Sequence, residues 1–358
     1  MKYANLPPHM WKFLESEMLV ILGLAEDATR TDAQIADIYS LKKGTVASIR
    51  RRLLDAGAIT FVNVPAFNKL GCEMIGFHVG TAEPTERVDA RANNYIEFSN
   101  KTPQLVHGLT GGSSVVFYTA LKNATEYDEI VQNHNRFFSG PRRESKARMV
   151  SAVFPFALTK INLVPNFAPI VHGFFQLDVP PPKCSAPVSA EVESPDLSKT
   201  ERTTLVALVE NPRASDREIA AIVGLSRQAI TRIRNKLLEE GICNPVCLPS
   251  LYKWGFEICA VAHPKFNMEM PWEKRLKSQP KEVAELSFYT LSKADEGVAN
   301  YILARYSDYS DRLQGILAWY HKAKALDETP DITLFPLERS TELRTFEFGP
   351  AVRHLMLS

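Results

Sequence analysis

The sequence of 358 residues lacks the features that mark secreted and membrane proteins. Its first residues, MKYANLPPHMWK, contain no apolar signal core, and no apolar run reaches the length of a membrane-spanning helix. The five cysteines do not form the disulfide framework of a small secreted domain. These absences predict a cytoplasmic protein with no membrane-bound part.

A metal site is also poorly supported. Cys243 and Cys247 have a spacing that could suit zinc, but no second Cys/His pair with suitable spacing follows them. Structural thiols at the start of a strand are therefore the favoured interpretation, and we expect neither a metal nor a cofactor. The net charge of +1 says little by itself, because the positive charge is concentrated in two short segments.

One of these segments, Ser215–Gly241, has the pattern of a helix-turn-helix. Ser215 and Glu218 form a capping box that starts a first helix. Gly224 suits a turn that needs positive φ, and Ser226 can cap a second helix. The apolar residues of that second helix fall on one face at helical spacing, and Gly241 supplies a left-handed stop.

The opposite face of the second helix is polar and basic, which suits base edges and phosphates in the major groove of DNA. The alternative is a solvated surface helix, but the preceding helix and turn favour DNA. We therefore expect this copy to bind DNA through Arg227, Gln228, Thr231, Arg232, Asn235 and Lys236.

The pattern occurs twice. A shift of 184 residues places Ser215–Gly241 on Thr31–Gly57, and an ungapped match runs from Glu17/Glu201 to Glu73/Glu257. Such self-similarity indicates an internal duplication. The first copy has lost most hydrogen-bonding side chains from the outward face but keeps its charge. It should grip phosphates, and its expected DNA-binding residues are Lys42, Lys43, Ser48, Arg51 and Arg52.

Each helix-turn-helix precedes strands and helices in the order βαββαβ, which predicts an α+β fold with two tandem copies of a winged helix-turn-helix and a ferredoxin-like domain. The second copy's middle strand is expected at Val283–Leu291. Both copies end alike, in Phe167–Val171 and Phe348–Val352, where we expect an extra strand. The predicted boundaries are 1–66 and 67–175 for the first copy, 176–198 for a Pro/Ser-rich linker, and 199–250 and 251–358 for the second.

The segment IAAIVGLSRQAITRIRNKLLEEGI at 219–242, with Pro249-x4-Trp254-Gly255 and the βαββαβ order, resembles the Lrp/AsnC (feast/famine) transcription regulators. The resemblance implies a winged helix-turn-helix joined to a small-molecule-sensing, ferredoxin-like RAM-type domain. Members dimerise through their sheets, so a tandem chain looks like a fused pseudo-dimer. The implied partners are double-stranded DNA, a small effector such as an amino acid or a related metabolite, and further copies of the chain.

In that family the effector site involves a Gly-x-Asp-like turn between the second and third strands. The residues at the corresponding turns are Gly111, Gly112 and Ser113 in the first copy and Asp295 in the second, and neither turn matches the pattern well.

Three functions follow from these patterns. The first is a sequence-specific transcriptional regulator without enzyme activity, which we favour from the sequence. The second is an enzyme of the siroheme decarboxylase type, because those enzymes are built from paired Lrp-like subunits, with His107, His134 and His172 as candidate groups. The third keeps DNA binding and makes the ferredoxin-like domains oligomerisation modules without a ligand.

Overall fold

The computed structural model describes residues 12–81, 87–138, 148–162, 165–182, 190–193, 196–344 and 346–357. Cys184 and residues 183–189 and 194–195 of the predicted linker lie outside this part of the chain. The chain divides into two compact units, each assembled from three separate segments. Unit 1 comprises 1–61, 161–188 and 245–338, whereas unit 2 comprises 62–160, 189–244 and 339–358.

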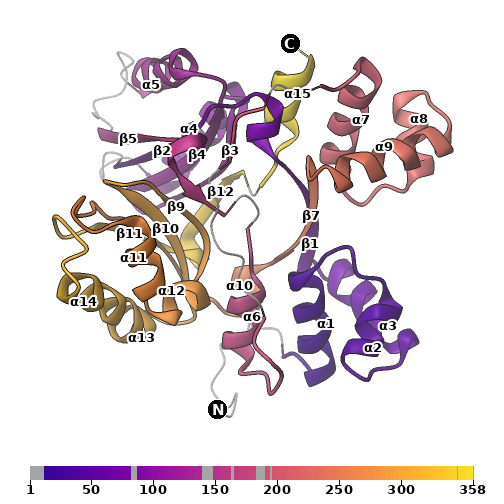
Figure 1. Ribbon diagram of the computed structural model, residues 1–358, viewed down its shortest axis with the longest axis horizontal. Coiled ribbons are helices and arrows are strands. Elements are labelled where there is room, and N and C mark those ends of the chain that lie inside the picture. The colour runs from indigo at the N-terminus through magenta and orange to yellow at the C-terminus, as the bar shows by residue number, and fades with distance from the viewer. Residues whose placement is uncertain are drawn as a thin grey trace. The chain divides into compact units, whose positions relative to one another are not determined.

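Each unit contains one helix-turn-helix with a preceding helix (Figure 1). Unit 1 has α1 (Glu15–Glu26), α2 (Asp32–Ile38) and α3 (Lys43–Asp55), and unit 2 has α7 (Lys199–Glu210), α8 (Asp216–Val223) and α9 (Arg227–Glu239). The predicted caps of the second copy are present: Ser215 and Glu218 form a capping box, Gly224 has φ 78°, and the Ser226 hydroxyl accepts a hydrogen bond from the Ala229 amide at 3.2 Å.

A two-stranded ribbon of β1 (Ile59–Pro65) and β7 (Cys243–Pro249) follows the two helix-turn-helix motifs. In unit 2 the Ala66 amide donates to the Ile242 carbonyl at 2.9 Å, and in unit 1 the Ser250 amide donates to the Ala58 carbonyl at 2.9 Å. These bonds are equivalent in the repeat. In each bond the acceptor lies just before the wing strand of one copy. The donor lies in the other copy, just before η1 (Phe67–Leu70) or α10 (Leu251–Trp254).

The ferredoxin-like part of unit 2 is an antiparallel five-stranded sheet in the order β12-β3-β4-β2-β5. Its strands are β2 (Met74–Thr81), β3 (Leu105–Gly111), β4 (Ser114–Leu121), β5 (Arg148–Pro155) and β12 (Ser340–Arg344), and its helices are α4 (Val88–Lys101) and α5 (Ala124–Phe138). Thus β12, close to the C-terminus, extends a sheet whose other strands come from the first copy.

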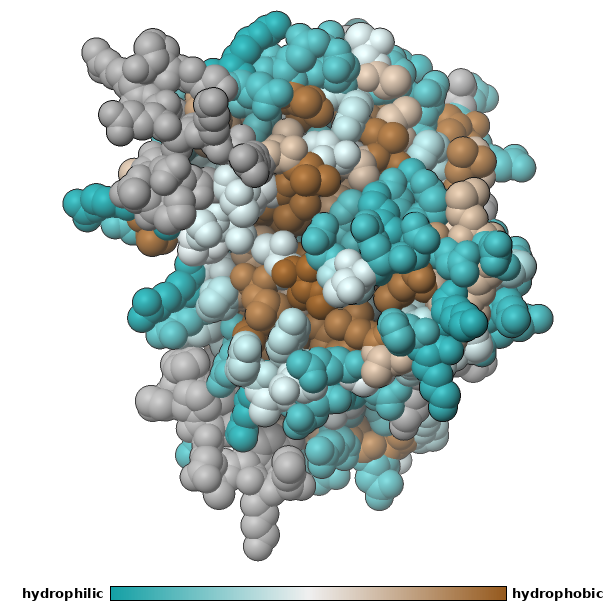
Figure 2. Space-filling model, turned by 90° about the vertical axis from the view of Figure 1, so that its left-hand side faces the viewer, coloured by the Kyte–Doolittle hydropathy of each residue, from teal (hydrophilic) through white to brown (hydrophobic). Residues whose placement is uncertain are grey.

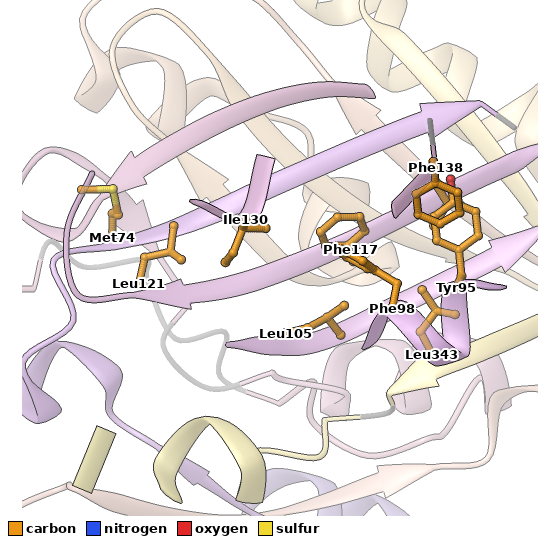
Figure 3. Packing of buried hydrophobic residues seen from close by; sticks show 10 residues of the cluster. Met74, Tyr95, Phe98, Leu105, Phe117, Leu121, Ile130, Phe138 and Leu343 are labelled. Atoms are coloured by element: carbon orange, nitrogen blue, oxygen red, sulfur yellow. The ribbon is translucent and has the colours of Figure 1, made fainter. Parts of the chain in front are cut away.

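The main core of this sheet is aromatic (Figure 3). Tyr95 and Phe98 of α4 and Phe138 of α5 pack over Phe117 of β4, with Leu343 of β12 at the edge of the cluster. The rings of Tyr95 and Phe138 lie 4.5 Å apart and those of Phe98 and Phe117 5.8 Å apart. Buried aromatic pairs of this kind contribute beyond their buried area, so α4 and α5 are firmly fixed on the sheet.

Unit 1 repeats the architecture, with the strand order β11-β8-β10-β9-β6. The strands are β6 (Lys160–Ile161), β8 (Ile258–His263), β9 (Ser287–Ser292), β10 (Gly297–Leu303) and β11 (Asp331–Pro336). The helices are α11 (Trp272–Ser278), α12 (Lys281–Leu286), α13 (Tyr306–Asp308), η3 (Tyr309–Leu313) and α14 (Gln314–Lys322). The predicted fold, with two tandem copies of a winged helix-turn-helix and a ferredoxin-like domain, is confirmed.

Two local predictions were wrong. The segment predicted as a strand at Val283–Leu291 begins inside α12 and becomes a strand only at Ser287. The shared tails are helices, α6 (Ala168–Phe175) and α15 (Gly349–Leu357), which pack on α1 and α7 of their own units. A Cβ at Gly349 would lie 2.7 Å from Cγ of Glu210, so this position of α15 needs glycine to approach α7.

Some of the apolar side chains lie on the surface of the protein. Figure 2 shows apolar side chains gathered in the middle of one face and bordered by hydrophilic ones. Among the described residues, no helix is long and apolar enough to cross a membrane. Surface of mixed character is ordinary for a folded chain, and this face by itself indicates no function.

Three histidines are buried in unit 2. Burial lowers the pKa of His78 to about 3 and the pKa values of His107 and His134 to about 4. His78 lies within hydrogen-bond distance of the Ser151 and Thr119 hydroxyls, whereas neither ring nitrogen of His134 has a hydrogen-bond partner. A histidine held neutral in the folded state is protonated first in the unfolded state, so stability falls as the pH drops from about 6.5 toward the folded pKa.

We therefore expect His134→Phe to reduce the acid sensitivity of the protein. His134 lies among Tyr95, Phe98 and Phe138, so a phenyl ring fits the chemistry of the site. Urea unfolding at pH 7.5 and 5.0 should show a loss of stability on acidification that is about 2 kcal/mol smaller than in the wild type. The exposed His321, replaced by Gln, is the control and should change nothing; an unaltered pH dependence in His134→Phe would contradict the prediction.

Candidate nucleic-acid interface

The outward face of α9 forms the groove that the sequence predicted as a DNA-reading surface. The groove is lined by Arg227, Gln228, Thr231, Arg232, Asn235, Lys236 and Glu239. On the opposite side of the helix, Ile230, Ile233 and Leu237 are buried against the rest of the winged helix. The helical period therefore separates an apolar packing face from a polar face open to solvent.

Four side chains of this face are available to a ligand. Arg227, Gln228, Arg232 and Asn235 are exposed, and in the described structure their side chains form no hydrogen bond or ion pair within the protein. These two guanidinium groups and two carboxamides, spaced one to four residues apart, offer the donors and acceptors that base edges and phosphates require.

The other two predicted residues are held by the protein itself. The Thr231 hydroxyl donates to Oδ2 of Asp216 at 2.5 Å, and Nζ of Lys236 lies 2.7 Å from Oε1 of Glu201. Arg234 is held in the same way, with its Nε 2.7 Å from Oδ1 of Asp216. Acids of α8 and α7 therefore face two of the cations of α9, Arg234 and Lys236.

The same brace occurs in the first copy. Nε of Arg50 lies 2.9 Å from Oδ1 of Asp32, and Nη2 of Arg52 lies 2.5 Å from Oε1 of Glu17. These pairs are the repeat equivalents of Arg234–Asp216 and Lys236–Glu201. Both copies retain these pairs although their outward faces differ. The pairs therefore hold α3 against α1 and α2, and α9 against α7 and α8, and the Arg52 side chain is engaged in one of them.

The remaining cations of the first copy are exposed. Lys42, at the N-cap of α3, and Lys43, Ser48 and Arg51 on the helix are exposed, and their side chains form no hydrogen bond or ion pair in the described structure. Ser40 takes φ 54° at the turn where the second copy has Gly224, a conformation that costs a non-glycine residue energy. The first copy thus presents charge with few directed hydrogen-bonding groups.

Two lysines that no sequence motif singles out bind the C-terminal ends of these helices. Nζ of Lys69 donates to the Glu240 carbonyl at the C-terminus of α9 (2.6 Å), and Nζ of Lys253 donates to the Ala56 carbonyl at the C-terminus of α3 (2.9 Å). A cation at a helix C-terminus satisfies an open carbonyl and complements the helix dipole. Their identity in the repeat was visible, but nothing in the sequence shows that each one serves the helix of the other copy.

The predicted effector residues occupy two hairpin turns. Gly111, Gly112 and Ser113 join β3 to β4 in unit 2, and Asp295 lies between β9 and β10 in unit 1. The Asp295 carboxylate is about half exposed and lies 3.7 Å from Nζ of Lys293. An effector site at these turns stays a prediction.

The residues proposed for metal or acid–base chemistry are mostly packing groups. Burial raises the pKa of Cys243 and Cys247 to about 12, which is expected of thiols packed in a strand. His107 and His134, with pKa values of about 4, are neutral at neutral pH, and the His172 ring lies 2.9 Å from the Val179 carbonyl. His107 and His134 would thus supply no positive charge for a carboxylate at neutral pH.

A winged helix-turn-helix in a tandem, ferredoxin-like framework is the class that this fold and surface define. Residues 197–242 match the family model described as winged helix-turn-helix DNA-binding. The Lrp/AsnC-like fold inferred from the sequence is confirmed as a fold. A search of curated proteins found no match.

Over nearly its whole length, the chain is similar to the crystal structure of the siroheme decarboxylase NirDL. The identity is 13% and the TM-score 0.50, with 95% of this chain and 98% of that chain covered. NirDL in complex with an iron-uroporphyrin III analogue gives 12% identity, a TM-score of 0.51 and the same coverage. The B. subtilis protein LrpC, at 16% identity and a TM-score of 0.31, covers 40% of this chain and 94% of its own.

This comparison corrects one expectation. We expected from the sequence a protein without enzyme activity, but a solved structure that matches 95% of the chain is that of an enzyme. At 13% identity the likeness establishes a shared fold, and that fold carries catalysis in the protein it matches.

The brace between α7 and α9 can be tested through its carboxylate. The hydrogen bond from Lys236 is the main cause that lowers the pKa of Glu201 to about 2, with a further contribution from Ser198. We expect Lys236→Met to raise the Glu201 pKa toward its ordinary value, as measured by NMR titration of the carboxyl carbon. Stability from this pair is present above pH about 4.5 and is lost as the pH falls toward 2. Lys236→Arg is the control that keeps the charge; a Glu201 pKa near 2 in Lys236→Met would show that Ser198 alone sets it.

Proposed function

We propose that this chain is a sequence-specific DNA-binding protein that regulates transcription, built as a covalently fused pseudo-dimer of Lrp/AsnC-like units. The observation that supports it most is the set of exposed, uncommitted side chains on α9: Arg227, Gln228, Arg232 and Asn235. Side chains of these types pair with guanine and adenine edges in the major groove, whereas a helix that only faces solvent needs no such combination.

In this proposal the two copies contact DNA in different ways. The α9 surface reads bases, while Lys42, Lys43 and Arg51 of α3 contact phosphates without selecting sequence. Phosphate contacts release condensed counterions, so the affinity should fall steeply with salt. One half-site of the DNA target should be well specified and the other nearly degenerate.

Replacing Arg232 with Ser, the residue that the first copy has at this position, tests the division. Duplexes selected by the wild-type protein from a random pool supply the target. We expect Arg232→Ser to lose about 1–3 kcal/mol of discrimination at one base pair, because a directed contact to a base edge is removed. Arg51→Ala, at the repeat equivalent of Asn235, is the comparison variant of the other copy; it should weaken binding to all duplexes equally and lower the salt slope by about one.

The assay is a titration of labelled duplexes at several salt concentrations, with each base pair of the selected site varied in turn. If Arg232→Ser kept the full discrimination between selected and random DNA, α9 would not be the reading helix. Absence of any selected sequence from the pool would remove the regulator proposal altogether.

A second candidate function is decarboxylation of a tetrapyrrole. It is favoured by the comparison that spans the chain, which is with a siroheme decarboxylase, whereas the winged-helix match spans residues 197–242 alone. Such an activity needs cations that hold several carboxylates and a proton donor. Two of the histidines predicted for that role, His107 and His134, are uncharged at neutral pH because they are buried, so neither would supply the charge.

Titration with iron-uroporphyrin III separates the two functions. If the chain is such an enzyme, the porphyrin absorption band should change saturably at one ligand per chain. Siroheme incubated with the protein under reducing conditions should also lose carbon dioxide, which mass spectrometry detects. Competing duplex DNA serves as the control for non-specific binding of a polyanion to the basic helices. Release of the porphyrin by moderate salt or DNA, with siroheme unchanged, would exclude this candidate.

A further inference from the structure

Unit 1 contains a cavity of about 240 Å³ that none of the functions above uses. It lies beside β9 and β10 and is bordered by α11 and α12, and Asn162 and Asn166 also line it. Phe266, Trp272 and Tyr320 give it an aromatic lining. The volume is below that of pockets for drug-sized molecules, so it suits a ligand smaller than those.

Arg275 is the cation of this cavity. Its side chain lines the space, is only 3% exposed, and places its guanidinium 3.6 Å from the centre of the Phe266 ring. It donates to the Ser292 hydroxyl and to the carbonyls of Lys293 and Ala294. Three bonds leave two of the five N–H groups of a guanidinium for a ligand.

No carboxylate compensates this buried charge in the described part of the chain. Glu296 lies in the turn that Arg275 supports, but it is already bound by His263, Lys265 and Lys293. Burial lowers the pKa of Arg275, as expected of a desolvated cation without a counterion. A buried unpaired charge is costly, and a bound anion would remove that cost.

A second polar group of the cavity is also unsatisfied. Oδ1 of Asn162 is buried and has no hydrogen-bond partner. An orphaned acceptor beside a cavity calls for a donor, which a bound molecule can supply. The cavity lining contains no Asp or Glu among the described residues, so nothing there would neutralise an ammonium group.

We propose that this cavity binds a small aryl carboxylate that carries a hydroxyl group and no ammonium group. Its carboxylate is the counterion of Arg275, its ring packs among Phe266, Trp272 and Tyr320, and its hydroxyl donates to Asn162. The inference does not depend on DNA binding or on decarboxylation, because all of its groups lie in unit 1 and none belongs to α3 or α9.

Calorimetric titration of the full chain with 4-hydroxyphenylacetate tests the proposal. We expect saturable binding at one molecule per chain. The affinity of the neutral 4-hydroxyphenylacetamide should be lower by a factor of about thirty or more, because this ligand leaves the buried charge unpaired. Tyrosine, which adds an ammonium group, and phenylacetate, which lacks the hydroxyl, should each bind more weakly than 4-hydroxyphenylacetate.

Two variants assign the contacts. Arg275→Gln should abolish the preference for carboxylate over amide, and Asn162→Ala should abolish the preference for 4-hydroxyphenylacetate over phenylacetate. If Arg275→Gln fails to fold, the comparison of the two ligands in the wild-type protein decides. Equal affinity of the acid and the amide, tyrosine binding as tightly as the acid, or no binding at millimolar concentrations would each overturn the proposal.

Discussion

The exchange of hydrogen bonds at the ends of the β1–β7 ribbon is the constraint on which the rest of the structure depends. A helix leaves its last carbonyls without partners, and those of α3 and α9 are met by Lys253 and Lys69, each from the opposite copy. The Ala58 carbonyl also accepts the indole N–H of Trp254 at 2.8 Å. The second helix of each helix-turn-helix therefore ends on residues that its own repeat does not supply.

Much of the fold could be predicted because its signals are local. The capping box of Ser215 and Glu218, the turn glycine at 224 and the spacing of Ile230, Ile233 and Leu237 each act within one or two helical turns. The acids that face Arg234 and Lys236 come from other helices, so the helix pattern alone could not show them. The tails were predicted as strands because short apolar segments around proline have no clear period, whereas packing on α1 and α7 makes them helical.

The candidate DNA surface was predicted in outline and refined by these pairs. Arg227, Gln228, Arg232 and Asn235 remain free, while Thr231, Lys236 and Arg52 belong to the internal brace. The enzyme question could not be settled in this way, because one fold can host both DNA binding and catalysis and the residues of a site decide between them. The sequence did not predict a role for Arg275, because the burial of an arginine is known only when its surroundings are known.

The composition of the two units sets the order in which the protein can form. Unit 1 joins residues 1–61 to residues 245–338, and the sheet of unit 2 takes β12 from positions 340–344. During synthesis, α1–α3 emerge from the ribosome long before the segment that holds the C-terminus of α3 exists. Contacts so distant in sequence form slowly and leave apolar surface exposed in the meantime. The nascent chain should consequently depend on chaperones until its last strand has been translated.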